Sequence, residues 1–393
     1  MPNSRTTAHA GQNRRHPSAT RSDPNPRHVR DAEVRIDAAA PGGDLAPIWA
    51  SMGYDEINYT YRPDGKKLLN SIGAFSPQPF HVRPHYMFCS GSGWGQPHWG
   101  NGNVYHEDAD GNPFYDFTLL DETYDAITGA GHHVLVELGF TPKDLVPEKA
   151  VFPVLSSPTV YSAYEQGLWS FPPKDYGKWA GLCAATAAHV LERYGAEEVS
   201  TWVWELWNEP DIFYWRGTPQ QYYDLYTVTV EAIRGVLPDA RVGGPSVTGG
   251  DDGVEFLRGF LKHCKATGTP LDYVSFHTKG SAFTPWRTYG PIGAPAPVQE
   301  SPSAVKMLFD NPNFRFQNTE YFPVFQAKLM KKLLDLSAAH SDNIEQATTW
   351  SFYFEGERYF EGTRSWTTQG GIEKPLMNAY RLFAKLGQRR LPA

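Results

Sequence analysis

The feature that most constrains the fold of this chain is an alternation between short apolar runs and longer segments of helical period. The apolar runs end in polar or glycine residues and cover 79–85, 133–140, 201–210, 240–245, 272–280 and 347–355, with a further run near 46–54. The helical segments cover 115–131, 176–195, 220–237, 254–268 and 321–336. Apolar strands separated by amphipathic helices are typical of a parallel sheet covered by helices. The number of repeats predicts an α/β fold of the (β/α)8 TIM-barrel type, for which 393 residues are sufficient.

Missing motifs and the overall charge argue against several functional classes. No glycine-rich turn of the GxGxxG or GxxxxGKS/T type follows the apolar runs, so a nucleotide-binding doubly wound fold loses its main support. The formal charge of −7 offers no basic surface to a phosphate backbone, so nucleic acid is not expected as a partner. No apolar run reaches the length of about 20 residues that a membrane span needs. The histidines lack the spacing of a zinc site, so we predict no metal and no cofactor.

The ends of the chain and its cysteines indicate how it is organised. Residues 1–32 are polar and contain no apolar signal-peptide core, which predicts a disordered tail and a cytoplasmic protein. Residues 33–388 are expected to form the catalytic barrel domain, with short flanking β elements that include one in 32–43; residues 389–393 are expected to form a second tail. The three cysteines lie far apart without CxxC spacing, which predicts free thiols in a reducing compartment.

The run VWELWNEPD (203–211) contains the strongest candidate for chemistry. Catalytic side chains of such barrels lie at the carboxyl ends of the strands, and Pro210 cannot donate a ladder hydrogen bond, so the strand should end on Glu209. With a period of two, Glu205 and Glu209 face the same way, Glu205 deeper and Glu209 at the mouth. A carboxyl walled by tryptophans at the mouth can keep a proton for a leaving group. On these residues alone, an ordinary hydrogen-bonded carboxylate remains the alternative.

The same run carries a family resemblance. WVWELWNEPD, with HVLVELGF before it and ARVGGP and DYVSFHTKG after it, resembles glycoside hydrolase family 39, the group of β-xylosidases and α-L-iduronidase. The resemblance extends from Val34 to Gly387 and implies a retaining glycosidase on a (β/α)8 barrel that acts on a small oligosaccharide or glycoside. It implies that Glu209 is the general acid/base and that Asn208 hydrogen-bonds the 2-hydroxyl of the sugar.

Further sugar-binding residues are implied at the ends of the other strands: Arg83, His85, His277, Lys279, Glu355 and Arg364. A lysine at position 279 resembles the iduronidase branch, in which a cation meets a sugar carboxylate. From spacing alone, His277 is equally a barrel histidine, Lys279 a solvated loop cation, and Glu355 with Arg364 a surface pair of little energetic value. Glu137 is expected to be a buried structural carboxylate. The aromatic residues Phe213, Tyr214 and Trp215 could stack on a sugar, although core packing is their default interpretation.

The chain departs from the family pattern at the seventh strand. A retaining mechanism needs a second carboxylate about 5–5.5 Å from the first, acting as the nucleophile at the end of that strand. Between 272–280 and the helix near Tyr321 the chain offers SPSAVKMLFDNPNFRFQNTEYFP (301–323), in which this strand is shortened or lost. Glu320, in the alternating stretch FRFQNTEY, is the candidate nucleophile. It is also suited to the first turn of a helix, where negative charge is favoured.

The sequence therefore predicts a retaining exo-glycoside hydrolase, β-xylosidase-like, that uses Glu209 as general acid/base and a second carboxylate as nucleophile. Three alternatives stay open: a carbohydrate-binding pseudoenzyme that lacks the nucleophile strand, an α-L-iduronidase-like hydrolase, and a transglycosylase that uses the same groups. Because the chain continues only briefly after 371–387, we expect most of the accessory β-sandwich common in the family to be absent and only a small residual β element to be present.

Overall fold

The computed structural model describes residues 35–37, 39–40, 42–91, 100–150, 167–248, 250–277, 321–350, 365–368 and 370–391 of the chain. They belong to two compact units. The main unit is Leu45–Gln388, and the second combines Met1–Asp44 with Arg389–Ala393. In the second unit, β1 (Gly43–Asp44) pairs antiparallel with β11 (Arg389–Arg390). β1 begins only at the last residue of the segment 32–43, and the described residues 35–37 of its alternating stretch form no strand. Part of the segment 389–393, expected to be a tail, pairs with β1.

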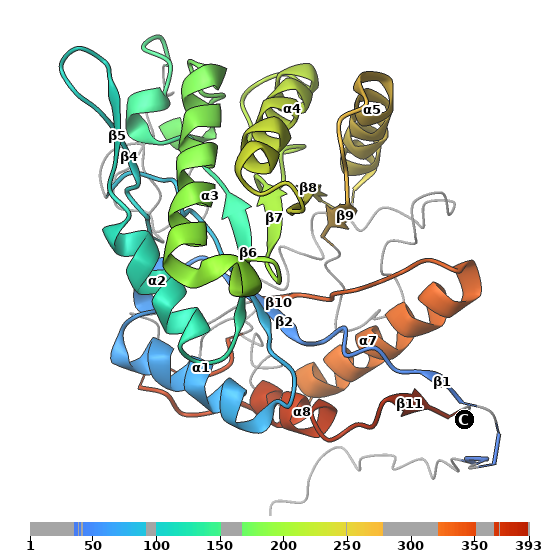
Figure 1. The fold of residues 1–393 in the computed structure, drawn as a ribbon. Helices are drawn as coiled ribbons and strands as arrows, with labels where there is room; N and C mark the ends of the chain where they lie inside the picture. Colours follow the sequence, from blue (N-terminus) through green and yellow to red (C-terminus); the bar gives the residue numbers. More distant parts are fainter. Residues whose placement is uncertain are drawn as a thin grey trace, which may run out of the picture. The chain divides into compact units, whose positions relative to one another are not determined.

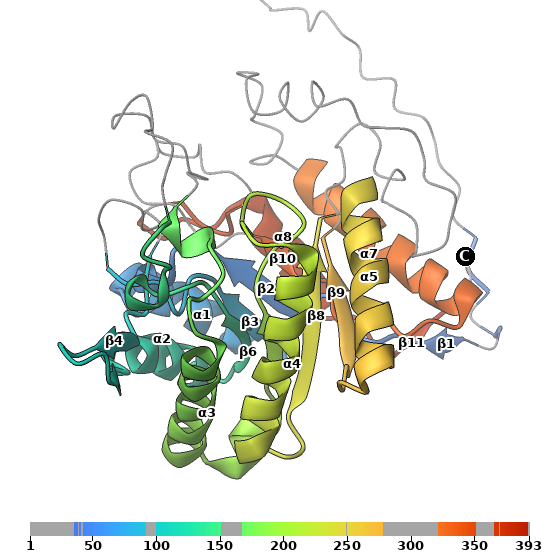
Figure 2. The ribbon, with the colours of Figure 1, turned by 90° about the horizontal axis from the view of Figure 1, so that it is seen from above.

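Seven parallel strands form the described sheet of the main unit, in the order β10-β2-β3-β6-β7-β8-β9. In chain order they are β2 (Ser51–Tyr54), β3 (His81–Pro84), β6 (His133–Leu138), β7 (Val203–Leu206), β8 (Arg241–Val247), β9 (Tyr273–Phe276) and β10 (Thr349–Trp350). The sheet curls as the wall of a barrel does (Figures 1 and 2). Each of the seven predicted apolar runs overlaps one of these strands, and β8 continues two residues beyond its run, to Val247. The predicted seventh barrel strand falls in 278–320, outside the described residues.

In the described part of the chain, helices alternate with these strands, and one helix follows the last strand. They are α1 (Pro63–Phe75), α2 (Thr118–Thr128), α3 (Tyr176–Val199), α4 (Pro219–Val236), α5 (Asp251–Thr267), α7 (Tyr321–His340) and α8 (Pro375–Phe383). Short 3-10 helices lie at η1 (Ile57–Tyr59), η2 (Lys143–Leu145) and η3 (Leu168–Ser170). In Figures 1 and 2, α3, α4 and α5 run side by side along one side of β6–β9. Each of the five predicted helical segments contains most of one of these helices or lies largely within one.

Three local predictions were incomplete or wrong. The segment 115–131 begins not as helix but in β5 (Pro113–Tyr115), which pairs antiparallel with β4 (Tyr105–Glu107). Helices α1 and α8 were not predicted. Two glycines lower the helix propensity of α1, but Gly65 is needed because an added Cβ would lie 2.0 Å from the Tyr59 carbonyl oxygen. Burial of its apolar face therefore outweighs local propensity.

The aromatic residues serve mainly as core. Trp169, Trp179, Trp202, Trp204 and Trp207 are almost completely buried. The cysteines Cys89, Cys183 and Cys264 are free and buried, and burial raises the pKa of the Cys264 thiol to about 11. These thiols are therefore poor nucleophiles near neutral pH. Within the described ranges, no helix combines the length and the apolar character that crossing a membrane requires.

The start of α4 allows a first prediction. The Thr218 hydroxyl accepts a hydrogen bond from the Gln221 backbone N–H at 3.2 Å, and the Gln221 side chain accepts one from the Thr218 N–H at 2.8 Å. This is a capping box, which satisfies two backbone donors at the helix end. Thr218→Ala should lower the free energy of unfolding in urea by about 1 kcal/mol. Thr218→Ser, which keeps the acceptor, is the control; equal losses in both variants would contradict the capping role.

Candidate functional site

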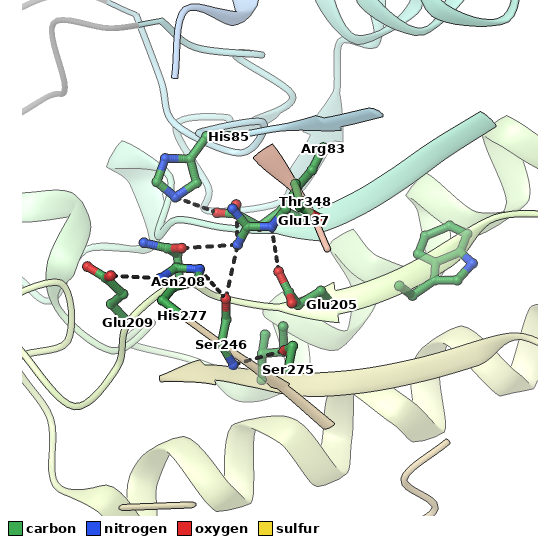
Figure 3. A network of polar contacts seen from close by, with 12 residues as sticks. Arg83, His85, Glu137, Glu205, Asn208, Glu209, Ser246, Ser275, His277 and Thr348 are labelled. Carbon is green, nitrogen blue, oxygen red and sulfur yellow. Dashed lines mark hydrogen bonds and ion pairs between the residues drawn. The ribbon is translucent and has the colours of Figure 1, made fainter. Parts of the chain in front are cut away.

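A buried ionic network of Arg83, Glu137 and Glu205 lies beneath Asn208 and Glu209 in the candidate site, and we call these three residues the floor (Figure 3). Arg83 of β3 lies between Glu137 of β6 and Glu205 of β7, two residues that the strand register places directly opposite each other. Arg83 Nε donates to Glu205 Oε2 at 2.6 Å, and Arg83 Nη2 lies 2.9 Å from Glu137 Oε2. The exposed fractions of the three residues are 4%, 0% and 3%. One cation is thus shared by two carboxylates in the interior, as predicted for the buried position of Glu137.

Burial and neighbouring opposite charges have opposing effects on the pKa values of these floor residues. Burial raises the pKa of Glu137 well above its ordinary value, Arg83 opposes that rise, and Glu205 adds to it. Burial alone would disfavour the guanidinium, but the charges of Glu137 and Glu205 outweigh burial and raise the pKa of Arg83. Arg83 therefore stays charged, and Glu137 is the member of the network that resists ionisation.

His85 lies beside the floor. Its Nδ1 is 2.7 Å from Asp55 Oδ1, its Nε2 is 3.1 Å from Glu137 Oε1, and the residue is 1% exposed. Burial lowers the pKa of His85 although Asp55 opposes this effect, so the neutral imidazole is favoured. The indole Nε1 of Trp350 donates to Asp55 Oδ2 at 3.4 Å. His85 is thus joined to the network by two carboxylates; its predicted contact with a sugar remains a prediction.

The loop after β7 carries Glu209, and here the sequence prediction needs correction. The strand ends at Leu206, three residues before Glu209, because Trp207 adopts a left-handed backbone with φ of 66°. Glu209 is left-handed too, with φ of 47°. Such conformations cost of order 1–3 kcal/mol for residues with a side chain and persist only where surrounding contacts impose them. One such contact is the 2.9 Å hydrogen bond from the Glu209 N–H to the Ser246 carbonyl.

Asn208 is oriented by the floor. Its Oδ1 accepts a hydrogen bond from Arg83 Nη2 at 3.1 Å, and the residue is 5% exposed. Because a guanidinium only donates, the amide oxygen of Asn208 faces Arg83 and its NH₂ group is turned to another side. The interaction ties the residue that precedes Glu209 to the charged floor.

A second chain of contacts reaches the Glu209 carboxyl. His277, directly after β9, lies with Nδ1 2.6 Å from Glu209 Oε1 and with Nε2 3.1 Å from the Ser246 hydroxyl (Figure 3). The same hydroxyl accepts a longer bond, 3.4 Å, from Arg83 Nη2. The Ser246 hydroxyl can therefore donate to Nε2 while Nδ1–H donates to Glu209. Glu209 is 5% exposed, whereas the His277 side chain is 30% exposed.

The structure brings together five of the predicted site residues: Arg83, His85, Asn208, Glu209 and His277. The other four, Lys279, Glu320, Glu355 and Arg364, lie outside the described residues. Tyr214 and Trp215 are buried in the aromatic core, with exposed fractions of 2% and 5%, so they offer no open face for stacking.

Sequence reasoning missed Ser246. This residue was overlooked because the apolar run was ended at Pro245, whereas β8 continues to Val247. The backbone of Ser246 is left-handed, with φ of 56°, a conformation that residues with a side chain rarely adopt. Its hydroxyl links Arg83 to His277. Extending the search for polar residues two positions beyond each apolar run would have found it.

Comparisons with known proteins bear on the family of the whole chain. Residues 32–393 match the family model "Glycosyl hydrolases family 39". A "Beta-xylosidase" of Geobacillus stearothermophilus is 31% identical over 320 residues, which cover 73% of this chain and 60% of the relative. An "Alpha-L-iduronidase" of Mus musculus is 29% identical over 273 residues, which cover 63% of this chain and 37% of the relative. The match thus spans less than two thirds of the length of these relatives.

The fold is shared with solved structures. The structure titled "Structure of a GH39 Beta-xylosidase from Caulobacter crescentus" superposes with a TM-score of 0.66 at 24% identity, covering 91% of this chain and 75% of the other. This likeness confirms the predicted TIM-type barrel fold. Because the family model matches nearly the whole chain, this protein belongs to family 39 of the glycosyl hydrolases.

Proposed function

We propose that this chain is a retaining exo-glycoside hydrolase of the β-xylosidase type in which Glu209 is the general acid and base. The observation that carries the proposal is the setting of the Glu209 carboxyl. It is nearly buried beyond the carboxyl end of β7, one of its oxygens is held by His277, and its neighbour Asn208 is fixed by Arg83. A general acid needs this combination of fixed direction and limited contact with water.

In the first step, Glu209 gives its proton to the glycosidic oxygen as a second carboxylate attacks the anomeric carbon. The bond between sugar and leaving group breaks, and the sugar becomes covalently joined to the enzyme. The NH₂ group of Asn208, turned away from Arg83, is suited to contact the sugar 2-hydroxyl. In the second step, the Glu209 carboxylate takes a proton from water, which displaces the enzyme carboxylate and releases the sugar with its original anomeric configuration.

The nucleophile belongs to a part of the chain outside the described residues, and Glu320 remains our candidate. One feature of the floor supports the presence of a further acceptor. Among the described residues, Arg83 Nη1 is buried and has no hydrogen-bond partner. Buried donors of this kind are almost always satisfied in proteins, and an additional carboxylate near the floor would satisfy this one.

The preference for a xyloside over an iduronide rests on the relatives. The bacterial β-xylosidase aligns over more of this chain, and over a larger share of its own length, than the mouse α-L-iduronidase. Lys279, which the iduronidase-like alternative would use to bind the sugar carboxylate, lies outside the described residues. The ratio of kcat/KM for an aryl β-xyloside to that for an aryl α-L-iduronide measures the preference directly. We expect it to exceed one.

Trapping the covalent intermediate tests the mechanism. A 2-deoxy-2-fluoro-xylosyl fluoride slows both steps and should label one carboxylate, which peptide mass mapping then identifies. We expect a single label on a residue other than Glu209, with Glu320 as the candidate. Labelling of Glu209 would exclude it as the acid/base.

Two further measurements address the alternative functions. Saturable xylose binding by calorimetry, without turnover or labelling, would establish a carbohydrate-binding protein instead of an enzyme. Added acceptor sugar distinguishes hydrolysis from transglycosylation by the products formed.

A further inference from the structure

Asp211, two residues after Glu209, makes contacts that the proposed mechanism does not use. Its Oδ1 accepts a hydrogen bond from the Thr248 N–H at 2.9 Å, and its Oδ2 accepts one from the Thr248 hydroxyl. The carboxylate lies against the first turn of α5, where a Cβ added to Gly253 would be 3.0 Å from Oδ2. Asp211 is half-buried, so these bonds are partly shielded from water. A single carboxylate thus joins the loop after β7 to the loop after β8.

This connection matters because the backbone of Glu209 needs support. Its left-handed φ of 47° is unfavourable for a residue with a side chain, so neighbouring contacts must hold it. Two contacts, one to β8 and one to the loop after it, hold this part of the chain. The Glu209 N–H bonds to the Ser246 carbonyl at 2.9 Å, and two residues later Asp211 bonds to Thr248. The second contact connects the turn after Glu209 directly to the neighbouring loop.

Asp211 also interacts electrostatically with Glu209. Burial raises the pKa of Asp211, the Thr248 hydrogen bonds oppose that rise, and the charge of Glu209 adds to it. The interaction is mutual, so an ionised Asp211 also makes ionisation of Glu209 less favourable. Other titratable groups that interact with Glu209 include His277 after β9, His85 after β3 and Glu137 in β6.

We propose that Asp211 is a positioning residue for Glu209: its carboxylate fastens the turn after Glu209 to the loop before α5 through Thr248, and this contact helps to hold the backbone that directs the Glu209 carboxyl. The proposal rests on the function proposed above for Glu209. The charge of Asp211 is a second effect to be tested beside this contact, and variants of Asp211 and Thr248 separate the two effects.

Asp211→Asn removes the charge and keeps an acceptor for Thr248. In the plot of kcat/KM against pH, we expect the decline on the alkaline side (the alkaline limb) to move to lower pH by about half to one unit, because Glu209 then loses its proton more readily. Asp211→Ala removes the contact with Thr248 as well, and should lower kcat by about 10–100-fold for a poorly activated leaving group with little change in KM. Thr248→Val weakens the contact but leaves the charge, so it should lower kcat without moving the alkaline limb.

Asp252→Asn is the matched control, because it removes one carboxylate from the exposed side of the same first turn of α5. It should leave the pH profile unchanged. Thermal unfolding of each variant, followed by circular dichroism, detects any general loss of stability. If kcat, the alkaline limb and the leaving-group dependence all stay at parent values in Asp211→Ala, the proposal is wrong.

A direct titration separates failure of this inference from failure of the proposed function. With ¹³C-labelled glutamate, the signal of Glu209 is assigned by its disappearance in Glu209→Gln, and its titration midpoint is measured without any substrate. In Asp211→Asn the midpoint should fall by about half to one pH unit. An unchanged midpoint refutes the charge coupling, whether or not the chain hydrolyses glycosides. Absence of turnover in the parent chain refutes the proposed function and leaves this measurement intact.

Discussion

Replacing Glu209 by glutamine is expected to lower kcat/KM for an aryl β-xyloside with a poorly activated leaving group by about 10²–10⁴-fold, the usual contribution of a general acid. Glutamine is nearly isosteric and keeps an acceptor for His277 Nδ1, so the contact of 2.6 Å can persist without the acidic proton. The loss should therefore lie in kcat more than in KM. Initial rates with a series of aryl xylosides measure it.

The leaving group supplies the internal control for Glu209→Gln. A dinitrophenyl leaving group departs without protonation, so its bond cleavage should be much less affected than that of a methoxyphenyl group. In Glu209→Ala, added azide should replace the base-assisted water and give a xylosyl azide of retained configuration. Glu231→Gln, on the exposed face of α4, should behave as the parent. Undiminished activity of Glu209→Gln with the poor leaving group would remove Glu209 from the mechanism.

The second large effect is expected on stability. Arg83→Met should lower the free energy of unfolding by about 3–5 kcal/mol, because it leaves Glu205 and Glu137 buried without their shared cation. Arg83→Lys should recover only part of the loss, since a single ammonium cannot reproduce the contacts of Nε and Nη2. Urea unfolding followed by tryptophan fluorescence measures both variants.

Two further variants test the reason for this loss. In the double variant Arg83→Met with Glu137→Gln, one of the two buried acidic groups left without a cation is replaced by a neutral amide, so stability should partly return. Arg241→Met removes an arginine from an exposed pair with Glu345 and should cost less than about 1 kcal/mol. If Arg83→Met costs no more than Arg241→Met, the floor network is not a source of stability.

The parallel sheet could be predicted because the sequence pattern of each strand is local. The runs around β6, β7 and β8 are short, apolar and followed by helical periods, so their identity depends on residues within about ten positions. The candidate acid could be predicted for a related reason. Asn208, Glu209 and Pro210 are adjacent in sequence, and the carboxyl end of a barrel strand is a known location for chemistry.

The surroundings of Glu209 could not be predicted in the same way. Arg83 and Glu205 are 122 positions apart, and His277 and Glu209 are 68 apart, so no local pattern connects them. Nor does a period of two hold beyond Leu206, because the left-handed backbone of Trp207 breaks it. Contacts of this kind depend on the tertiary arrangement of strands, and a single sequence does not encode them in spacing.

The left-handed backbone at Trp207 and Glu209 has a consequence for protein engineering. A designer who transplanted Asn-Glu-Pro onto an idealised barrel would choose unstrained loops, and the acid would then point elsewhere. The graft would need partners on the next two strands, in the manner of Ser246 and His277, to bend the loop and hold the carboxyl. The portable unit is therefore a three-strand sector of the scaffold, and the tripeptide alone is too small to transfer activity.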